Sequence, residues 1–314
     1  MIKKLAFVLL LVLIFCSTNS FLAQKEKEVA VSNDKGELSG TLMLPKKKKN
    51  IPVVLIIAGS GPTDRNGNQA MMQTDTYKLI AEVLAENNIA SLRYDKQGIG
   101  KSQEAGRPQS EMVFEHFVDD AVLWIDYLSN QKRFSDVIVL GHSEGVLIGT
   151  LAAQRTATAK LIAVAGTGRK IDEVILEQLS AQSDSLRRQA VPVFDSLRAG
   201  QMVEDVPATL LSLFHPSIQP YMISWMTIDP AEEISKLTCP TLVIQGTTDL
   251  QVKIKDAELL AAANEKATLE IIEGMNHILK DAPEDYQGNM MTYTDPKLSL
   301  NEDFVNHLVR YVNK

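Results

Sequence analysis

The segment Gly141-His142-Ser143-Glu144-Gly145 contains the residue types of a serine nucleophile. It follows a short apolar run at 137–140 and precedes an apolar, helix-like stretch. In a tight turn between a strand and a helix, only small residues fit on either side of the serine, and its hydroxyl is exposed above the sheet. The pattern therefore predicts that Ser143 is a nucleophile. A plain glycine turn is the alternative.

A serine hydroxyl needs a base before it can attack a carbonyl carbon. His277, in the loop sequence GMNH after an expected strand, is the preferred base among five histidines. His142 adjoins the serine, but its side chain should point away from it. His215 is kept as a minor candidate for the base. His116 and His307 are expected on helices.

The base in turn needs a carboxylate that holds its tautomer and stabilises the imidazolium ion. Asp249 ends the sequence GTTD just after an expected strand, so it is the preferred acid. Asp256 and Glu273 are alternatives that better fit solvated positions. Along the chain, the nucleophile Ser143 precedes the acid Asp249, and the base His277 follows. This order is expected for such a triad.

Attack on a carbonyl creates an oxyanion, which two backbone N–H groups must stabilise together. Glu144 follows the nucleophile, and its N–H is one expected donor. The second donor should come from the sequence AGSG, where Gly59 permits a turn and Ser60 follows it. The N–H of Ser60 is therefore the second expected donor, with Gly61 as the alternative.

These residues follow short apolar runs that have the composition of strands buried on both faces. The runs alternate with helical segments, which predicts an α/β fold with a mostly parallel sheet, opened by an antiparallel hairpin. Ligands bind beyond the carboxyl ends of such strands, where the candidate residues lie. The hairpin strands are expected at 28–32 and 37–44, and the buried strands at 51–58, 89–94, 137–140, 161–165, 241–244 and 269–272.

The alternation stops between about 170 and 238, where no strand pattern is convincing. Five prolines are expected to cut most of this segment into short pieces. We therefore predict a core at 24–169 and 239–314 with a helical cap inserted at 170–238. Apolar cap residues could pack on one another or line an acyl pocket, and both uses are expected. The candidate pocket residues are Leu213, Phe214, Tyr221, Trp225 and Met226.

The first 23 residues are typical of a secretory signal peptide. Two lysines precede an unbroken apolar run at 5–15, and cleavage is expected after Ser20 or Ala23. Export to the periplasm or the extracellular space follows. An uncleaved anchor is one alternative. A lipid on Cys16 is another, although the bulky Phe15 before it is unfavourable.

The net charge and the hydropathy of the chain argue against nucleic acid and against a membrane span. Loss of the first 23 residues removes two lysines and no acids, which changes the formal charge from −7 to −9. An acidic chain argues against nucleic acid as a partner. No later segment approaches the roughly 20 apolar residues of a membrane span, so none is expected after signal cleavage.

A metal site is not expected either. Asp64, Asn66 and Asn68 alternate like the ligands of a calcium loop, but Gln69 stands where that loop requires glycine. Asp64 and Arg65 are instead expected to brace the rim of the site. The chemistry assembled above needs no cofactor.

The sequence resembles the α/β-hydrolase superfamily from about residue 28 to the C-terminus. Within it, the chain is similar to the bacterial esterase and serine-aminopeptidase-like group, through the sequences GSGPTDR, RYDKQGIGKS and GTTD. The resemblance implies the triad, the two oxyanion donors and the cap at the positions given above. Gln97 departs from the pattern where arginine is common, and Ala58 where histidine often precedes the glycine. These departures affect how the loops that contain Ala58 and Gln97 pair with their neighbours. They do not affect the triad chemistry.

Together these features predict a serine hydrolase that cleaves small-molecule esters of small to medium apolar acids through an acyl-enzyme. A serine peptidase or aminopeptidase of the same fold is the first alternative. A non-catalytic lipid-binding or surface protein is the second, and the complete set of nucleophile, acid and base argues against it.

Overall fold

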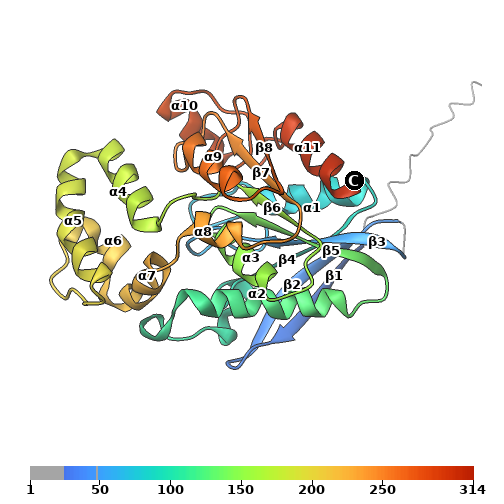
Figure 1. Ribbon diagram of the computed structural model, residues 1–314, viewed down its shortest axis with the longest axis horizontal. Coiled ribbons are helices and arrows are strands. Elements are labelled where there is room, and N and C mark those ends of the chain that lie inside the picture. The colour runs from blue at the N-terminus through green and yellow to red at the C-terminus, as the bar shows by residue number, and fades with distance from the viewer. Residues whose placement is uncertain (1–24, 47–48) are drawn as a thin grey trace, which may run out of the picture.

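A central eight-stranded sheet organises the protein (Figure 1). The computed structural model describes residues 25–46 and 49–314, so the expected signal peptide lies outside the described residues. The strands are β1 (Lys25–Ser32), β2 (Glu37–Leu44), β3 (Ile51–Ile57), β4 (Ala90–Tyr94), β5 (Phe134–His142), β6 (Lys160–Val164), β7 (Thr241–Gly246) and β8 (Ala267–Ile272).

The strand order is β1-β2-β4-β3-β5-β6-β7-β8. β1 pairs antiparallel with β2, and β2 pairs antiparallel with β4. Every other pairing among these strands is parallel. This arrangement confirms the predicted α/β fold with its opening hairpin. The parallel strands all end at one edge, which brings the loops after β3, β4, β5, β7 and β8 together.

Helices cover both faces of the sheet. α1 (Thr76–Glu86) and α11 (Glu302–Asn313) cover one face, and their buried side chains join a core with β3, β5, β6 and β7. The other face is covered by α2 (Phe114–Ser129), α3 (Glu144–Gln154) and α9 (Ile254–Ala263). Burial on both faces explains why β3 and β5 read as continuous apolar runs. None of the described helices combines the length and apolar character that crossing a membrane requires.

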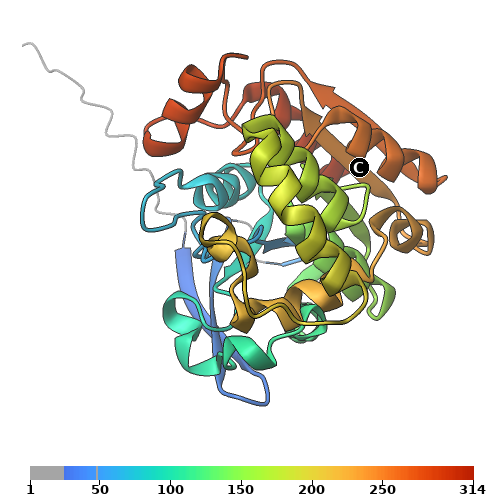
Figure 2. The same ribbon diagram turned by 90° about the vertical axis from the view of Figure 1, so that its left-hand side faces the viewer.

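The segment 170–238 contains helices and no strand (Figures 1 and 2). Its α-helices are α4 (Ile171–Gln182), α5 (Asp184–Arg198), α6 (Leu211–Phe214), α7 (Gln219–Met226) and α8 (Pro230–Ser235). In Figure 2, α4 and α5 lie side by side in front of the sheet. α8 instead packs on α3 and α9, close to the sheet.

Pro192 does not end a helix, contrary to the expectation for this segment. It lies inside the 15-residue helix α5, whereas Pro220 and Pro230 stand in the first turns of α7 and α8. A proline in a first turn loses no intrahelical hydrogen bond. α5 tolerates its interior proline because one face is packed in the core, through Ala190, Val193, Phe194 and Leu197. Packing therefore outweighs the local cost.

Candidate active site

Ser143 occupies the sharp turn between β5 and α3. Its backbone is strained, with φ 55° and ψ −121°, in a region that residues with side chains rarely adopt. A Cβ on Gly141 would overlap the Gly145 carbonyl oxygen, and a Cβ on Gly145 would overlap that of Ile57. The two glycines are therefore required by the close packing of β3, β5 and α3, which holds the serine in its turn.

His277 and Asp249 form a buried pair in the loops after β8 and β7. The distance between His277 Nδ1 and Asp249 Oδ2 is 2.8 Å. Asp249 Oδ1 accepts hydrogen bonds from the backbone N–H groups of Gln251 and Val252, at 2.7 and 3.0 Å. Burial alone would raise the pKa of Asp249, but His277 and these N–H donors outweigh it and hold the pKa below its usual value. The carboxylate is thus ionised and orients the ring.

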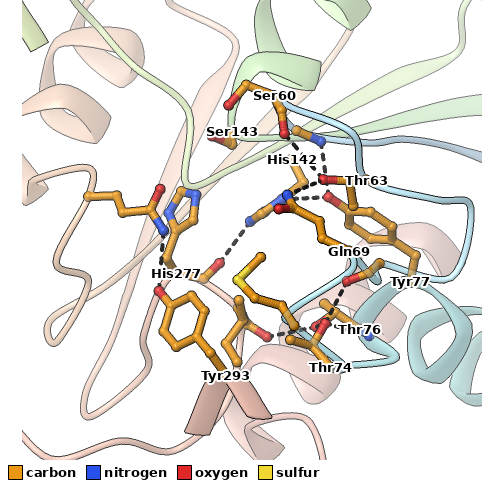
Figure 3. A pocket seen from close by; sticks show the side chains of 15 residues that line it. Ser60, Thr63, Gln69, Thr74, Thr76, Tyr77, His142, Ser143, His277 and Tyr293 are labelled. Atoms are coloured by element: carbon orange, nitrogen blue, oxygen red, sulfur yellow. Dashed lines mark hydrogen bonds between the residues drawn. The ribbon is translucent and has the colours of Figure 1, made fainter. Parts of the chain in front are cut away.

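Ser143 and His277 line one cavity of about 110 Å³, which we call the serine cavity (Figure 3). Loops at the carboxyl edge of the sheet supply most of its wall, together with Tyr77 of α1 and Tyr293 near the C-terminus. Ser60 also lines this cavity. The structure thus brings the expected nucleophile, the expected base and one expected oxyanion residue to a common space.

His142, next to Ser143, belongs to a hydrogen-bonded chain that the sequence did not indicate. The Gly59 N–H donates to Tyr77 Oη at 3.0 Å, and Tyr77 Oη lies 2.9 Å from His142 Nδ1. His142 Nε2 lies 2.8 Å from the carbonyl oxygen of His277, which can only accept. This requires the proton on Nε2, so Tyr77 donates to Nδ1. Burial, together with the nearby His277, lowers the pKa of His142 to about 3.

The other candidates for base and acid lie in different surroundings. Asp256 is buried, but it pairs with Arg169 at 2.8 Å and not with a histidine. Glu273 is exposed. His215 bonds Ser217 on the surface, at 2.8 Å. His116 accepts a hydrogen bond from the Val113 N–H at the start of α2. His307 bonds Arg310 within α11.

The Glu144 side chain belongs to a buried cluster with Lys96 and Tyr221. Its Oε2 lies 2.8 Å from Lys96 Nζ, and its Oε1 accepts a hydrogen bond from Tyr221 of α7. Lys96 Nζ also donates to the Gly59 carbonyl oxygen at 2.7 Å, and it lies 5.1 Å from the centre of the Phe117 ring. The side chains of Lys96 and Glu144 are only 4% and 2% exposed, so this is a buried ion pair.

A second cavity of about 380 Å³ lies beside this cluster, and we call it the lysine cavity. Its volume falls within the range of small-molecule pockets, about 300 to 1,000 Å³. Gly61 and Glu144 line it, so the two cavities flank the Gly59–Gly61 loop and the start of α3. Its apolar wall consists of Pro62, Ile99, Met112, Phe117, Ile218 and Tyr221.

Most of the expected cap pocket residues do not line either cavity. Tyr221 lines the lysine cavity, whereas Phe214 is buried against Phe194, with ring centres 4.8 Å apart. Trp225 stacks on Phe114 at 5.5 Å. The remaining two also pack with the core of the cap and sheet: Leu213 and Met226. The apolar character of these side chains suited both packing and a pocket, so it could not indicate which of them face a cavity.

Gln97, the departure in the loop after β4, has a defined partner on each side. Its Nε2 donates to Asp120 at 2.7 Å, and Arg107 Nη1 donates to its Oε1 at 2.8 Å. The bond to Asp120 ties this loop to α2. Within residues 25–46 and 49–314, no three His, Cys, Asp or Glu side chains are grouped so that they could bind a metal ion.

Comparisons with known proteins identify a family and a fold for this chain. The family model described as serine aminopeptidase, S33, matches residues 70–282, which include Ser143, Asp249 and His277. Esterase EstD of Thermotoga maritima is 28% identical over 271 residues, which cover 83% of this chain. The chain spans 63% of the length of that relative.

Two solved esterases share the fold at lower sequence identity. Est1E from Butyrivibrio proteoclasticus is 19% identical with a TM-score of 0.59, over 91% of this chain and 99% of its own. The Pyrococcus furiosus esterase Pf2001 is 15% identical with a TM-score of 0.58, over 93% of this chain and 91% of its own. At these identities the likeness concerns the fold alone.

Proposed function

The chain belongs to the serine aminopeptidase S33 family of serine hydrolases, and from that premise we propose that it hydrolyses carboxylic esters of small to medium apolar acids. The observation that carries the proposal is the 2.8 Å contact of His277 with Asp249 at a cavity that Ser143 also lines. The similarity to esterase EstD supports an ester as substrate.

In the proposed mechanism, Ser143 Oγ attacks the ester carbonyl carbon while His277 Nε2 takes the hydroxyl proton. Asp249 accepts the Nδ1–H of His277 and stabilises the imidazolium ion that forms. The N–H groups of Ser60 and Glu144 donate to the oxyanion of the tetrahedral intermediate. These four residues and the nucleophile complete the acylation site.

Collapse of the intermediate breaks the bond between the carbonyl carbon and the alcohol oxygen. His277 gives its proton to that oxygen, and the alcohol leaves. Water then attacks the acyl-enzyme carbonyl carbon while His277 takes a proton from it. The bond between that carbon and Ser143 Oγ breaks, His277 returns the proton to Oγ, and the free acid leaves. Every proton moves between His277, Ser143, water and the substrate, so the cycle needs no cofactor.

The carboxylates around the two cavities favour an ester over a peptide with a free N-terminus. An aminopeptidase needs a carboxylate that is free to pair with the substrate ammonium group. Among the described residues, the lining of the serine cavity contains none, and Glu144 is the carboxylate in the lining of the lysine cavity. Both oxygens of Glu144 already have partners, Lys96 and Tyr221. No free carboxylate in the described lining of either cavity is therefore available to bind an ammonium group.

A substrate series tests the proposal. We expect kcat/KM for nitrophenyl esters to rise by up to about fourfold per methylene from acetate to butyrate or hexanoate, since each buried methylene contributes about 0.8 kcal/mol. Aminoacyl nitroanilides should react at least about 10²-fold more slowly. Ser143→Ala serves as the control for background hydrolysis. Faster turnover of anilides with a free amino group would identify an aminopeptidase instead.

We also propose that the protein is exported, on the basis of residues 1–23. Intact-mass measurement of protein recovered from the cell envelope or medium should show an N-terminus between Phe21 and Lys25 without lipid. The mass of a chain that begins at a diacylated Cys16 would contradict this proposal, as would recovery of the full chain from the cytoplasm.

A further inference from the structure

We propose that Lys96 is a positioning residue that aims the Ser60 N–H at the oxyanion, a role that rests on the proposed function. Lys96 Nζ donates to the Gly59 carbonyl oxygen at 2.7 Å. The Gly59 N–H donates to Tyr77 Oη at 3.0 Å, so both backbone polar groups of Gly59 are held by side chains. Each of these three residues is buried.

The contact with Gly59 matters because its carbonyl belongs to the same peptide unit as the Ser60 N–H. This unit is trans, since the described residues contain no cis peptide bond. In a planar trans unit, C=O and N–H point in opposite directions. Lys96 lines the lysine cavity, whereas Ser60 lines the serine cavity with Ser143 and His277. Holding the carbonyl on one side therefore directs the N–H to the other.

The next peptide unit has the reverse orientation. The Ser60 carbonyl oxygen accepts a hydrogen bond from Thr63, which lines the serine cavity, at 3.2 Å. The Gly61 N–H of that unit therefore points away from Thr63, and Gly61 itself lines the lysine cavity. Of the two N–H groups that the sequence left open, this geometry favours Ser60 as the oxyanion donor.

Lys96 acts on the strength of the donor as well as on its direction. A cation on a carbonyl oxygen draws charge from the amide and makes its N–H a stronger donor. The cation is retained in this buried position because Glu144 pairs with it at 2.8 Å. Glu144 supplies the other expected oxyanion donor through its own N–H. The ion pair thus ties together the two chain segments that form the oxyanion hole.

The test compares Lys96→Met with the wild-type protein, using nitrophenyl butyrate and a fluorophosphonate probe. We expect kcat and the second-order rate of labelling at Ser143 to fall by about 10- to 100-fold, with KM within about threefold, because the lost contact acts in the transition state. Lys96→Met leaves Glu144 buried without its cation, which destabilises the fold. The double variant Lys96→Met/Glu144→Gln removes that charge, and we expect it to regain stability but not rate.

Arg169→Met is the matched control, because Arg169 also pairs with a buried carboxylate, Asp256, away from both cavities. We expect a lower melting temperature for this control and rates within about twofold of wild type. Wild-type rates in a folded variant without Lys96, the double variant included, would overturn the proposal. If the wild-type protein is labelled at Ser143 but cleaves no ester, the esterase proposal fails, and the labelling rates still test Lys96.

Discussion

The surroundings of Asp249 decide which nitrogen of His277 carries a proton. Two backbone N–H groups donate to Oδ1, so the carbonyl oxygen of an asparagine would take that place and its amide nitrogen would face His277 Nδ1. The histidine would then carry its proton on Nε2, where it cannot accept from Ser143. We therefore expect Asp249→Asn to lower kcat by roughly 10⁴-fold with the fold retained.

The control for this experiment is Asp256→Asn. Asp256 is equally buried and lies at the start of the helix after Asp249, but its partner is Arg169. We expect a loss of stability in that variant and a kcat within about threefold of wild type. Steady-state kinetics with circular dichroism on both proteins distinguishes the two effects. A loss of less than tenfold in Asp249→Asn would mean that another acid orients the base.

Sequence patterns indicate candidate catalytic residues better than they indicate the residues that would support them. Ser143, Asp249 and His277 stand at strand ends in recognisable sequences. Lys96 stands at a strand end as well, but a lysine in a loop usually lies in solvent, and nothing local indicates a carboxylate 48 positions away. His142 could be excluded as the base, yet its bond to the His277 carbonyl depends on the packing of two loops.

At the level of the elements, the turn that carries Ser143 depends on the contact of α3 with β3. A Cβ at position 145 would overlap the Ile57 carbonyl oxygen, and α3 has no room to retreat because it is buried against the sheet and α2. We expect Gly145→Ala to lower the free energy of unfolding by about 3 kcal/mol or more. Urea unfolding measures this change.

Gly200→Ala is the matched control for that variant. Gly200 has a positive φ of 72°, but no heavy atom lies within 4 Å of a Cβ built there. The expected cost is about 1 to 2 kcal/mol, from the left-handed backbone alone. Equal losses in the two variants would show that steric overlap at the turn does not determine stability.

The strands were easier to predict than the surroundings of the helices between β6 and β7. A strand buried on both faces leaves a continuous apolar run, and β3, β5, β6 and β7 all have one. A cap helix has one face toward its own core and another toward the sheet or a cavity, and both faces can be apolar. Phe214 and Tyr221 are both aromatic residues of this segment. Phe214 is buried in the core and Tyr221 lines the lysine cavity, and this difference arises from tertiary packing.

Over the whole molecule, Asp120 links the hairpin, the loop after β4 and α2. Its carboxylate accepts hydrogen bonds from Asn33 at 3.2 Å and from Gln97 at 2.7 Å. Burial raises its pKa from 3.8 to about 7 in spite of these bonds. The folded protein therefore binds a proton that the unfolded chain releases, so the free energy of unfolding falls as the pH rises from about 4 to 7.

This linkage predicts the behaviour of Asp120→Asn. The variant cannot lose that proton, so its stability relative to wild type should increase by about 2 to 3 kcal/mol between pH 5 and pH 8. Chemical unfolding at both pH values measures the difference. Asp119→Asn is the control, because the neighbouring carboxylate is half exposed and pairs with Arg155 on the surface. A constant difference at the two pH values would show that Asp120 is ionised throughout.

The helices between β6 and β7 can vary between related proteins without a change in the sheet. Because α8 packs on α3 and α9 beside the sheet, it can make the return crossing to β7, and the helices from α4 to α7 form an excursion that the sheet does not need. An excursion of this kind can change in length or sequence while the catalytic loops stay in place. Tyr221, however, bonds Glu144 from within it. A graft of a foreign cap would therefore have to bring its own hydrogen-bond donor to that carboxylate, and this sets a design rule for exchanging caps between relatives.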